Sequence, residues 1–270
     1  MIKKDNFFKK HWIDVLAVVL IAAAIIALLA VIYVEFNFEK KIEVFYKNFI
    51  TNEGYRDVLK GLKNTCIIAV LGLVIGIFIG TFIAIIKVFP SYSRGVRYAQ
   101  KAVSVYVAFF RGTPIVVQLL VGYFILFPLL KLKIAPVNAC VIMFGLNSGA
   151  YISEIMRSGI NSVDSGQLEA ARAVGMPFSV AMLKVVVPQA VKNILPTLGN
   201  EFIALIKETA VVGYVGAVDI TVAFQYLGSN SYEYMVPYLV MAIVYIIIVA
   251  AISALIKLME RKLAKSERNG

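Results

Sequence analysis

Long apolar segments constrain the fold of this chain more than any other feature of its sequence. Residues 13–34, 66–86, 102–130, 137–156 and 235–256 carry few or no charged side chains. A transmembrane helix needs about 20 mainly apolar residues, because each residue adds only ~1.5 Å of rise. With 60% hydrophobic residues and a mean hydropathy of +0.84, the 270-residue chain is more apolar than a soluble domain. The sequence therefore predicts an all-α, polytopic membrane protein.

The distribution of charge predicts six transmembrane helices with the N and C termini in the cytoplasm. A less apolar stretch, residues 195–218, holds three charged side chains and is counted as the fifth of the six spans. Lys and Arg gather in residues 1–10, in residues 87–101 and in the tail that begins at Lys257. Because cytoplasmic loops of membrane proteins are enriched in Lys and Arg, these segments are placed inside the cell. An even number of spans brings both basic ends to that side.

The positive charge is interpreted as an orientation signal and not as a nucleic-acid surface. The net charge is +11, and the basic residues cluster at the flanks of the apolar segments. A nucleic-acid interface would instead need a basic patch or stripe on one face of a folded domain. We therefore expect membrane lipid around this chain, a location in the cell membrane and no nucleic-acid partner.

The sequence carries no motif for catalysis, metal binding or a cofactor. It lacks a GxxxxGK[ST] phosphate loop and an HExxH zinc motif. Cys66 and Cys140 lie inside apolar segments and lack the spacing of metal ligands or of a disulfide framework. We expect no metal, no cofactor and no enzyme activity in this chain by itself.

A polar stretch between two apolar segments, residues 166–188, predicts a compact structure outside the lipid. Three of its residues recur at every third position and predict one apolar face of a short helix: Leu168, Ala171 and Val174. Glu169 and Arg172, three residues apart, are expected side by side on a more exposed face. Gly175 follows, where a helix end favours a residue with positive φ. Pro177 then suits the first turn of a second helix.

This stretch resembles the Glu-Ala-Ala loop of ATP-binding-cassette importer permeases. The loop pattern in that family is Glu-Ala-Ala, three residues, Gly, nine residues and Ile-x-Leu-Pro. Here it reads Glu169-Ala170-Ala171, Gly175 and Val185-x-Val187-Pro188, with the spacing kept. Val replaces the Ile and the Leu of the pattern, which is a mild departure.

Further segments are similar to those of polar amino acid permeases within the family. They are residues 111–118 (RGTPIVVQ), 147–154 (NSGAYISE) and 195–209 (LPTLGNEFIALIKET). The resemblance covers roughly residues 58–263 and implies a core of five transmembrane helices. It thus implies three parts: residues 1–57, with a cytoplasmic tail, an extra helix and an extracytoplasmic loop; the permease domain, residues 58–263; and a cytoplasmic tail, residues 264–270.

The resemblance also implies the partners and the mechanism. A permease of this family works with two ATPase subunits, a second permease chain (a homodimer or a similar heteromer) and an extracytoplasmic solute-binding protein. ATP binding closes the ATPase pair, and the loop passes this motion to the spans in an alternating-access cycle. The residues expected to couple to the ATPase are Leu168, Glu169, Ala170, Ala171, Arg172, Gly175 and Phe178. The alternative is an ion-coupled secondary amino acid carrier that works without an ATPase.

Polar residues inside the spans suggest a substrate pathway. Asn147, Tyr151 and Glu154 follow each other at helical spacing, and Ser148 lies on the neighbouring row. Glu154 would bind the ammonium group of an amino acid, with Tyr151 and Asn147 as hydrogen-bonding groups, while Arg111 would pair with a carboxylate. Two alternatives remain: a structural Arg111–Glu154 pair without a ligand, or a position of either residue at the cytoplasmic end.

Two other patterns concern packing. Gly72, Gly76 and Gly80 share one helix face, and small residues at this spacing allow another helix to approach closely. Glu201 and Lys207 are interpreted as part of a structural network inside the bundle. Gly112 and Pro114 are expected to interrupt the third span beside a cavity.

Overall fold

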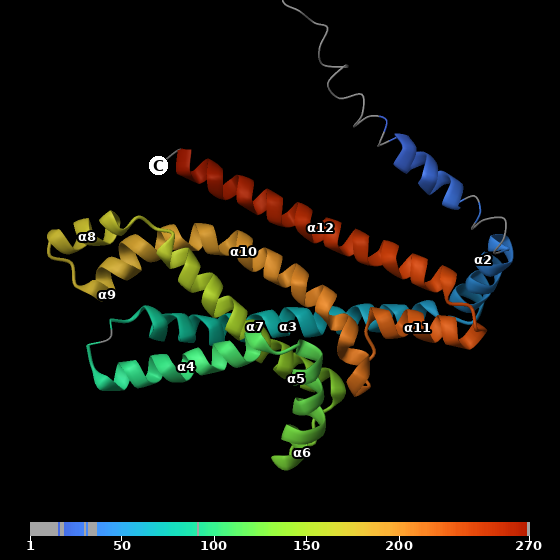
Figure 1. The fold of residues 1–270 in the computed structure, drawn as a ribbon, viewed down its shortest axis with the longest axis horizontal. Coiled ribbons are helices and arrows are strands. Elements are labelled where there is room, and N and C mark those ends of the chain that lie inside the picture. Colours follow the sequence, from blue (N-terminus) through green and yellow to red (C-terminus); the bar gives the residue numbers. More distant parts are fainter. Residues whose placement is uncertain (1–15, 17–18, 30, 32–36, 91, 269–270) are drawn as a thin grey trace, which may run out of the picture.

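The computed structural model describes residues 16, 19–29, 31, 37–90 and 92–268, and this part of the chain contains helices and no strand. Figure 1 labels the α-helices in chain order. They are α2 (Phe38–Tyr46), α3 (Tyr55–Val88), α4 (Arg94–Gly112), α5 (Ile115–Val121), α6 (Phe127–Leu129), α7 (Pro136–Asn161), α8 (Ser165–Ala173), α9 (Phe178–Ala181), α10 (Val187–Glu208), α11 (Ile220–Ser231) and α12 (Met235–Arg268). π-Helical turns cover Lys47–Thr51, Gly122–Leu126 and Met182–Val186, and a 3₁₀ helix covers Thr209–Val215.

Four helical segments in the described part are long and apolar enough to cross a membrane. They are Tyr55–Val88, Pro136–Asn161, Phe178–Val215 and Met235–Arg261. A fifth results if α4 and the helix Ile115–Leu129 count as one broken span, since they bend by 108°. The predicted interruption at Gly112 and Pro114 is therefore confirmed.

The first predicted span, residues 13–34, lies partly outside the described residues. Within it, Val19–Leu29 forms a shorter apolar helix, and its side chains are exposed. Residues 1–10 and the last two residues of the predicted cytoplasmic tail, residues 264–270, lie outside the described part as well. The count of six spans and the location of both termini stay predictions.

The fifth predicted span begins earlier than expected. The sequence predicts a loop up to Ile194, but helical structure runs from Phe178 through a π-helical turn into α10. Pro188 does not end this helix, because it lies in the first turn of α10, where its missing N–H is tolerated. Pro196 lies inside α10.

Close packing of α3 against α7 forms the centre of the molecule. The predicted glycine face is confirmed, because Gly72, Gly76 and Gly80 are all buried against α7. A methyl group at Gly80 would lie within 2.9 Å of atoms of Ile152 and Ser153. Such contact lets the two helices approach more closely than larger residues would allow.

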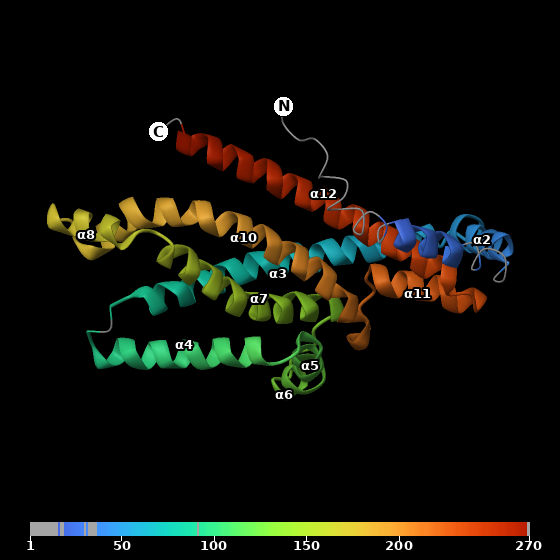
Figure 2. The same ribbon diagram turned by 45° about the horizontal axis from the view of Figure 1, so that its top comes forward.

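The two ends of the bundle carry different elements. Figures 1 and 2 both place α8 and α9 at the same end as the C terminus of α12, and α2 and α11 at the opposite end. The positive-inside interpretation assigns the α8–α9 end to the cytoplasm. At the other end α2 is fastened to the turn before α12, because Lys41 forms an ion pair with Glu233 (Nζ–Oε2 3.1 Å).

Candidate functional site

The polar stretch forms two short helices, α8 and α9, joined by a tight turn at Gly175. Asp164 begins α8, where its carboxylate accepts a hydrogen bond from the Gly166 N–H (2.7 Å). At the other end Gly175 has a φ of 85°. Its N–H bonds to the Arg172 carbonyl (3.0 Å), and the Met176 N–H bonds to the Ala171 carbonyl (3.2 Å). This pair of bonds is the Schellman helix end, so the predicted positive φ is confirmed.

Arg172 supports this turn and does not pair with Glu169. Its guanidinium donates to the Met176 carbonyl (3.1 Å), and no ion pair joins the two charged side chains in this described segment. Glu169 is exposed. Both charged groups therefore remain on the outer surface of the turn, where a partner protein can contact them.

The apolar residues of α8 are not all covered. Ala171 is buried, and Leu168 and Phe178 are half-buried. The predicted apolar face is wrong at Val174, which is 75% exposed, because α8 ends at Ala173 and the chain turns away from the bundle there. Ala170 and Gly175 are exposed too. The turn thus presents a small apolar tip between charged residues.

The base of the turn rests on the ends of two long helices. The Phe178 ring packs edge-on against Phe89, which follows α3 (centroids 6.4 Å apart, 84° between planes). Ile160 of α7 and Met182 line the hollow beside Phe178. The Asn193 side chain of α10 donates to the Ser162 hydroxyl at the end of α7 (2.8 Å). A displacement of α8 and α9 would therefore be transmitted to α3, α7 and α10.

The polar residues of α7 do not share one site, because each has a different neighbour. Asn147 is buried and donates from Nδ2 to Gln118 Oε1 (2.9 Å). Gln118 in turn donates from Nε2 to the carbonyls of Phe110 (2.8 Å) and Thr113 (2.9 Å). These carbonyls lose their helical partners at the break between α4 and α5, so the two amides satisfy the broken helix. Gln118 was not among the predicted site residues.

Arg111 and Glu154 do not pair with each other. The Arg111 guanidinium lies over the Tyr151 ring, with its central carbon 5.5 Å from the ring centroid. Glu154 instead bonds to Lys87 at the end of α3 (Oε1–Nζ 2.6 Å) and to Arg157 one turn along α7 (Oε2–Nη2 2.7 Å). The alternative of a structural Arg111–Glu154 pair is thereby excluded.

Only one of the two basic partners of Glu154 could have been predicted from the sequence. Arg157 could have been found from its spacing of three residues on the same helix. Lys87 lies 67 positions away, so only the fold brings it to Glu154. Because Lys87 and Arg157 already neutralise the carboxylate of Glu154, this residue is poorly suited to bind the ammonium group of a ligand.

Ser148 connects α7 to α10. Its hydroxyl donates to Glu201 Oε1 (3.0 Å), and it is fully buried. Glu201 is half-buried, and in the described part of the chain its carboxylate accepts this hydrogen bond from Ser148. Glu201 keeps more capacity for a cationic ligand than Glu154, which already has two basic partners.

A family model described as "Binding-protein-dependent transport system inner membrane component" matches residues 76–265. The chain belongs to this family of permeases of ATP-binding-cassette importers. It is a multi-pass membrane protein and a permease subunit. Of the two functions left open by the sequence, the ion-coupled carrier is not favoured.

Similar curated proteins are permeases of amino acid transport systems. A "Putative glutamine transport system permease protein" of Rickettsia bellii is 39% identical over 77% of this chain and 94% of its own length. An "Arginine transport system permease protein" of Bacillus subtilis is 37% identical over 78% of this chain and 94% of its own.

A solved structure with the same fold is described as an amino acid ABC transporter with histidines. It is 38% identical, has a TM-score of 0.72 and covers 78% of this chain and 96% of the compared chain. Inward-facing structures of a methionine ABC transporter are 21% identical with a TM-score of 0.62, which supports the fold alone.

Proposed function

We propose that this chain is the permease of an importer for a polar amino acid. The observation that carries the proposal is the similarity over most of the chain to permeases named for glutamine and arginine, at 39% and 37% identity. The solved transporter with histidines, at 38% identity, supports the same substrate class. These three amino acids share the α-ammonium and α-carboxylate groups but differ in side-chain charge.

Two ATPase subunits, a second permease chain and an extracytoplasmic binding protein complete the proposed importer. ATP is hydrolysed by the ATPase subunits, and this chain converts their motion into transport. We assign the permease domain to residues 58–263. Residues 1–57 are an addition, and within it α2 and the following π-helical turn pack on α11 and α12.

The ATPase engages the turn between α8 and α9 in this proposal. Glu169, Arg172 and Val174 are exposed there and offer charged groups around an apolar contact. Phe178 and the buried Ala171 connect the turn to the ends of α3 and α7. Because helices joined by close packing move as units, ATPase closure would shift α3, α7 and α10 together.

The amino acid passes the polar side chains of the spans in the proposed pathway. Arg111 and Tyr151 contribute an exposed guanidinium and a partly exposed ring. Ser148 orients Glu201. Asn147 supports the pathway through Gln118 at the break between α4 and α5. Glu154, held by two cations, braces the cytoplasmic ends of α3 and α7.

Uptake by reconstituted vesicles tests the proposal. The permease is incorporated with its ATPase, ATP is supplied on the ATPase side, and the binding protein is added on the other side with labelled glutamine, arginine or histidine. We expect accumulation of at least one amino acid that requires ATP, the ATPase and the binding protein. Uptake that persists without the ATPase and follows an ion gradient would instead establish a secondary carrier.

A further inference from the structure

Lys207 is a cation at membrane depth. It lies in the last turn of α10, inside the candidate span Phe178–Val215, and its side chain is exposed. It borders a hollow of about 590 Å³ whose other wall is Met241, Tyr245 and Val249 of α12. These α12 residues fall in the middle of the uncharged segment 235–256, so Lys207 is level with the centre of a span.

The acidic groups near Lys207 do not form an ion pair with it in the described part of the chain. Glu201, nearly two turns earlier on α10, accepts a hydrogen bond from Ser148. Asp219 is buried, bonds to the Val222 N–H (2.9 Å) and accepts from the Tyr245 hydroxyl (3.4 Å). Glu208 follows Lys207 directly and interacts with its charge, but the two side chains leave α10 in different directions and form no direct ion pair. A charged side chain at this depth costs at least about 2.5 kcal/mol, so it is a functional-site hypothesis by default.

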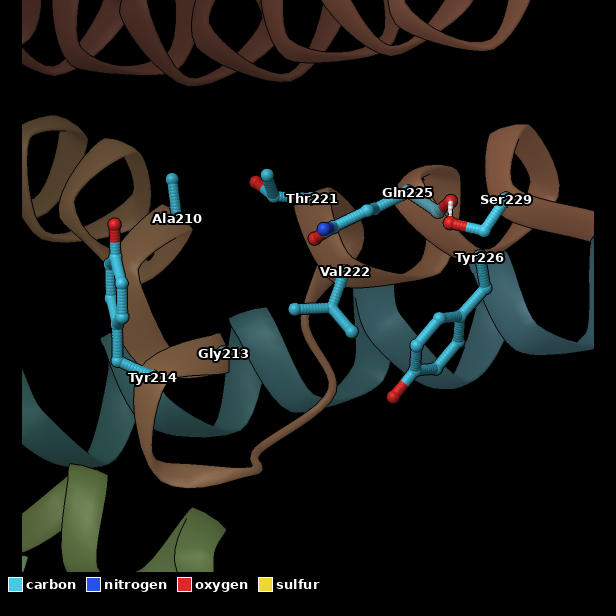
Figure 3. Close-up of a pocket in the computed structure, with 8 residues that line it drawn as sticks. All are labelled: Ala210, Gly213, Tyr214, Thr221, Val222, Gln225, Tyr226 and Ser229. Carbon is cyan, nitrogen blue, oxygen red and sulfur yellow. Dashed lines mark hydrogen bonds between the residues drawn. The ribbon is translucent and has the colours of Figure 1, made fainter. Parts of the chain in front are cut away.

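A second, more polar hollow continues from Lys207 toward the α11 end of the bundle. It measures about 470 Å³ and shares Ala210 and Thr221 with the first hollow. Figure 3 shows its lining: Tyr214 stands on the 3₁₀ helix, while Gln225 and Tyr226 extend from α11. Tyr214 and Tyr226 are 67% and 48% exposed, so their hydroxyl groups are accessible. Because they share lining residues, we treat the two hollows as one groove. Its α11 end carries the hydrogen-bonding side chains, and its other end carries Lys207.

We propose that Lys207 binds the α-carboxylate of the transported amino acid at the deep end of this groove. The proposal rests on the proposed function and adds the residue that holds the anionic end of the substrate. Each hollow is within the ~300–1,000 Å³ of small-molecule sites. The Thr221 hydroxyl lines the same hollow but is used within the fold: the Tyr245 hydroxyl donates to Asp219, so Thr221 donates to Tyr245 (3.0 Å), and Lys207 is the group that the hollow offers to a carboxylate.

The test is direct binding of an amino acid to the permease–ATPase complex without the binding protein. Labelled glutamine, arginine and histidine are the probes, and their α-carboxamides, which lack the anionic carboxylate, are competitors. Lys207→Met is compared with Lys207→Arg, which keeps the charge. We expect Lys207→Met to weaken binding by roughly tenfold or more, or ~1.4 kcal/mol. We also expect it to remove the preference for the acid over the carboxamide, whereas Lys207→Arg keeps this preference. Basal ATP hydrolysis by both variants shows that the complex is assembled.

Lys207 could instead pair with the carboxylate of Glu208 from a second copy of the chain. The variant Glu208→Gln removes that carboxylate and so distinguishes this alternative from binding of the substrate. If the anion is the substrate, Glu208→Gln keeps the preference for the acid over the carboxamide. The proposal is overturned if Lys207→Met binds and discriminates as the wild type does. It is overturned as well if Glu208→Gln reproduces the weakened binding while the preference survives in Lys207→Met. Failure of the wild-type importer to transport or bind any of the three amino acids would reject the proposed function itself.

Discussion

The turn from α8 to α9 and the polar residues of α7 differ in where their polar groups find partners. In the turn, Glu169 and Arg172 stay on the surface, and the Val174 side chain is 75% exposed. In α7, Asn147, Ser148 and Glu154 all bond to side chains of other parts of the bundle. The turn therefore has free capacity for a partner protein, while most of the polar capacity of α7 is used to hold the fold.

This difference separates two kinds of polar residue in a membrane transporter. A buried polar group without a partner is costly in lipid, so folding supplies a partner wherever one is within reach. A polar group that remains exposed after folding is the better candidate for binding another molecule. The predictions below rest on this division: variants in the turn should affect coupling, and variants in the bundle should affect stability.

Gly175→Asp should have the largest effect. The aspartate adds a side chain and a charge at a φ of 85°, on the surface proposed to dock on the ATPase. We expect ATP-driven uptake to fall by about tenfold or more, equivalent to ~1.4 kcal/mol of lost docking energy, with membrane insertion retained. Uptake and insertion are measured in the same vesicles.

Gly175→Asn is the matched control, because Asn has nearly the same size, carries no charge and tolerates the left-handed conformation. It should keep more uptake than Gly175→Asp does. Normal ATP-driven uptake by Gly175→Asp would contradict the coupling role of this turn.

Glu154→Gln should affect stability more than transport affinity. The substitution weakens the bonds to Lys87 and Arg157, whose charges then lack a counterion. We expect a loss of roughly 1.5–3 kcal/mol, because hydrogen bonds to charged groups contribute about this much. It is seen as a lower Tm of the purified complex, with the KM for uptake nearly unchanged. A large rise in KM at an unchanged Tm would contradict this prediction and support a role of Glu154 in substrate binding.

Gly80→Ala should have the smallest effect. The added methyl group overlaps Ile152 and Ser153 at the contact of α3 with α7. Overpacking costs about 1–3 kcal/mol, and the higher helix propensity of Ala offsets up to ~1 kcal/mol of it. A lower Tm is expected. Gly112→Ala is the control, because a methyl group there would have no atom within 4 Å apart from its chain neighbours and the backbone of its own helix. Equal Tm values for the two variants would refute the close-packing interpretation.

Local features of the fold could be predicted from the sequence, and long-range ones could not. The positive φ at Gly175, the interruption at Gly112 and the glycine face of α3 each depend on a few neighbouring residues, and all three are confirmed. The start of the fifth span was misplaced because the loop was predicted to continue to Ile194, although Pro188 already lies in the first turn of α10.

The candidate site was harder to predict for the same physical reason. Helical spacing places Asn147, Tyr151 and Glu154 along α7, but it does not say which helix approaches each of them. Gln118 and Lys87 come from other parts of the chain and satisfy two of these residues. The three polar residues that share one face of α7 therefore make three separate contacts in the fold.

The central claim is that the α8–α9 turn is the docking point for the ATPase, and site-directed cross-linking tests it most directly. Cys66 and Cys140 are first replaced, and a single cysteine is introduced at Val174 or, as the control, at Tyr232. Tyr232 is 91% exposed and directly follows α11, the helix at the opposite end of the bundle. We predict a cross-link from Val174→Cys to the ATPase that changes in yield when ATP is added, and none from Tyr232→Cys. The absence of any cross-link at Val174 in a complex that still imports an amino acid with ATP would contradict the account.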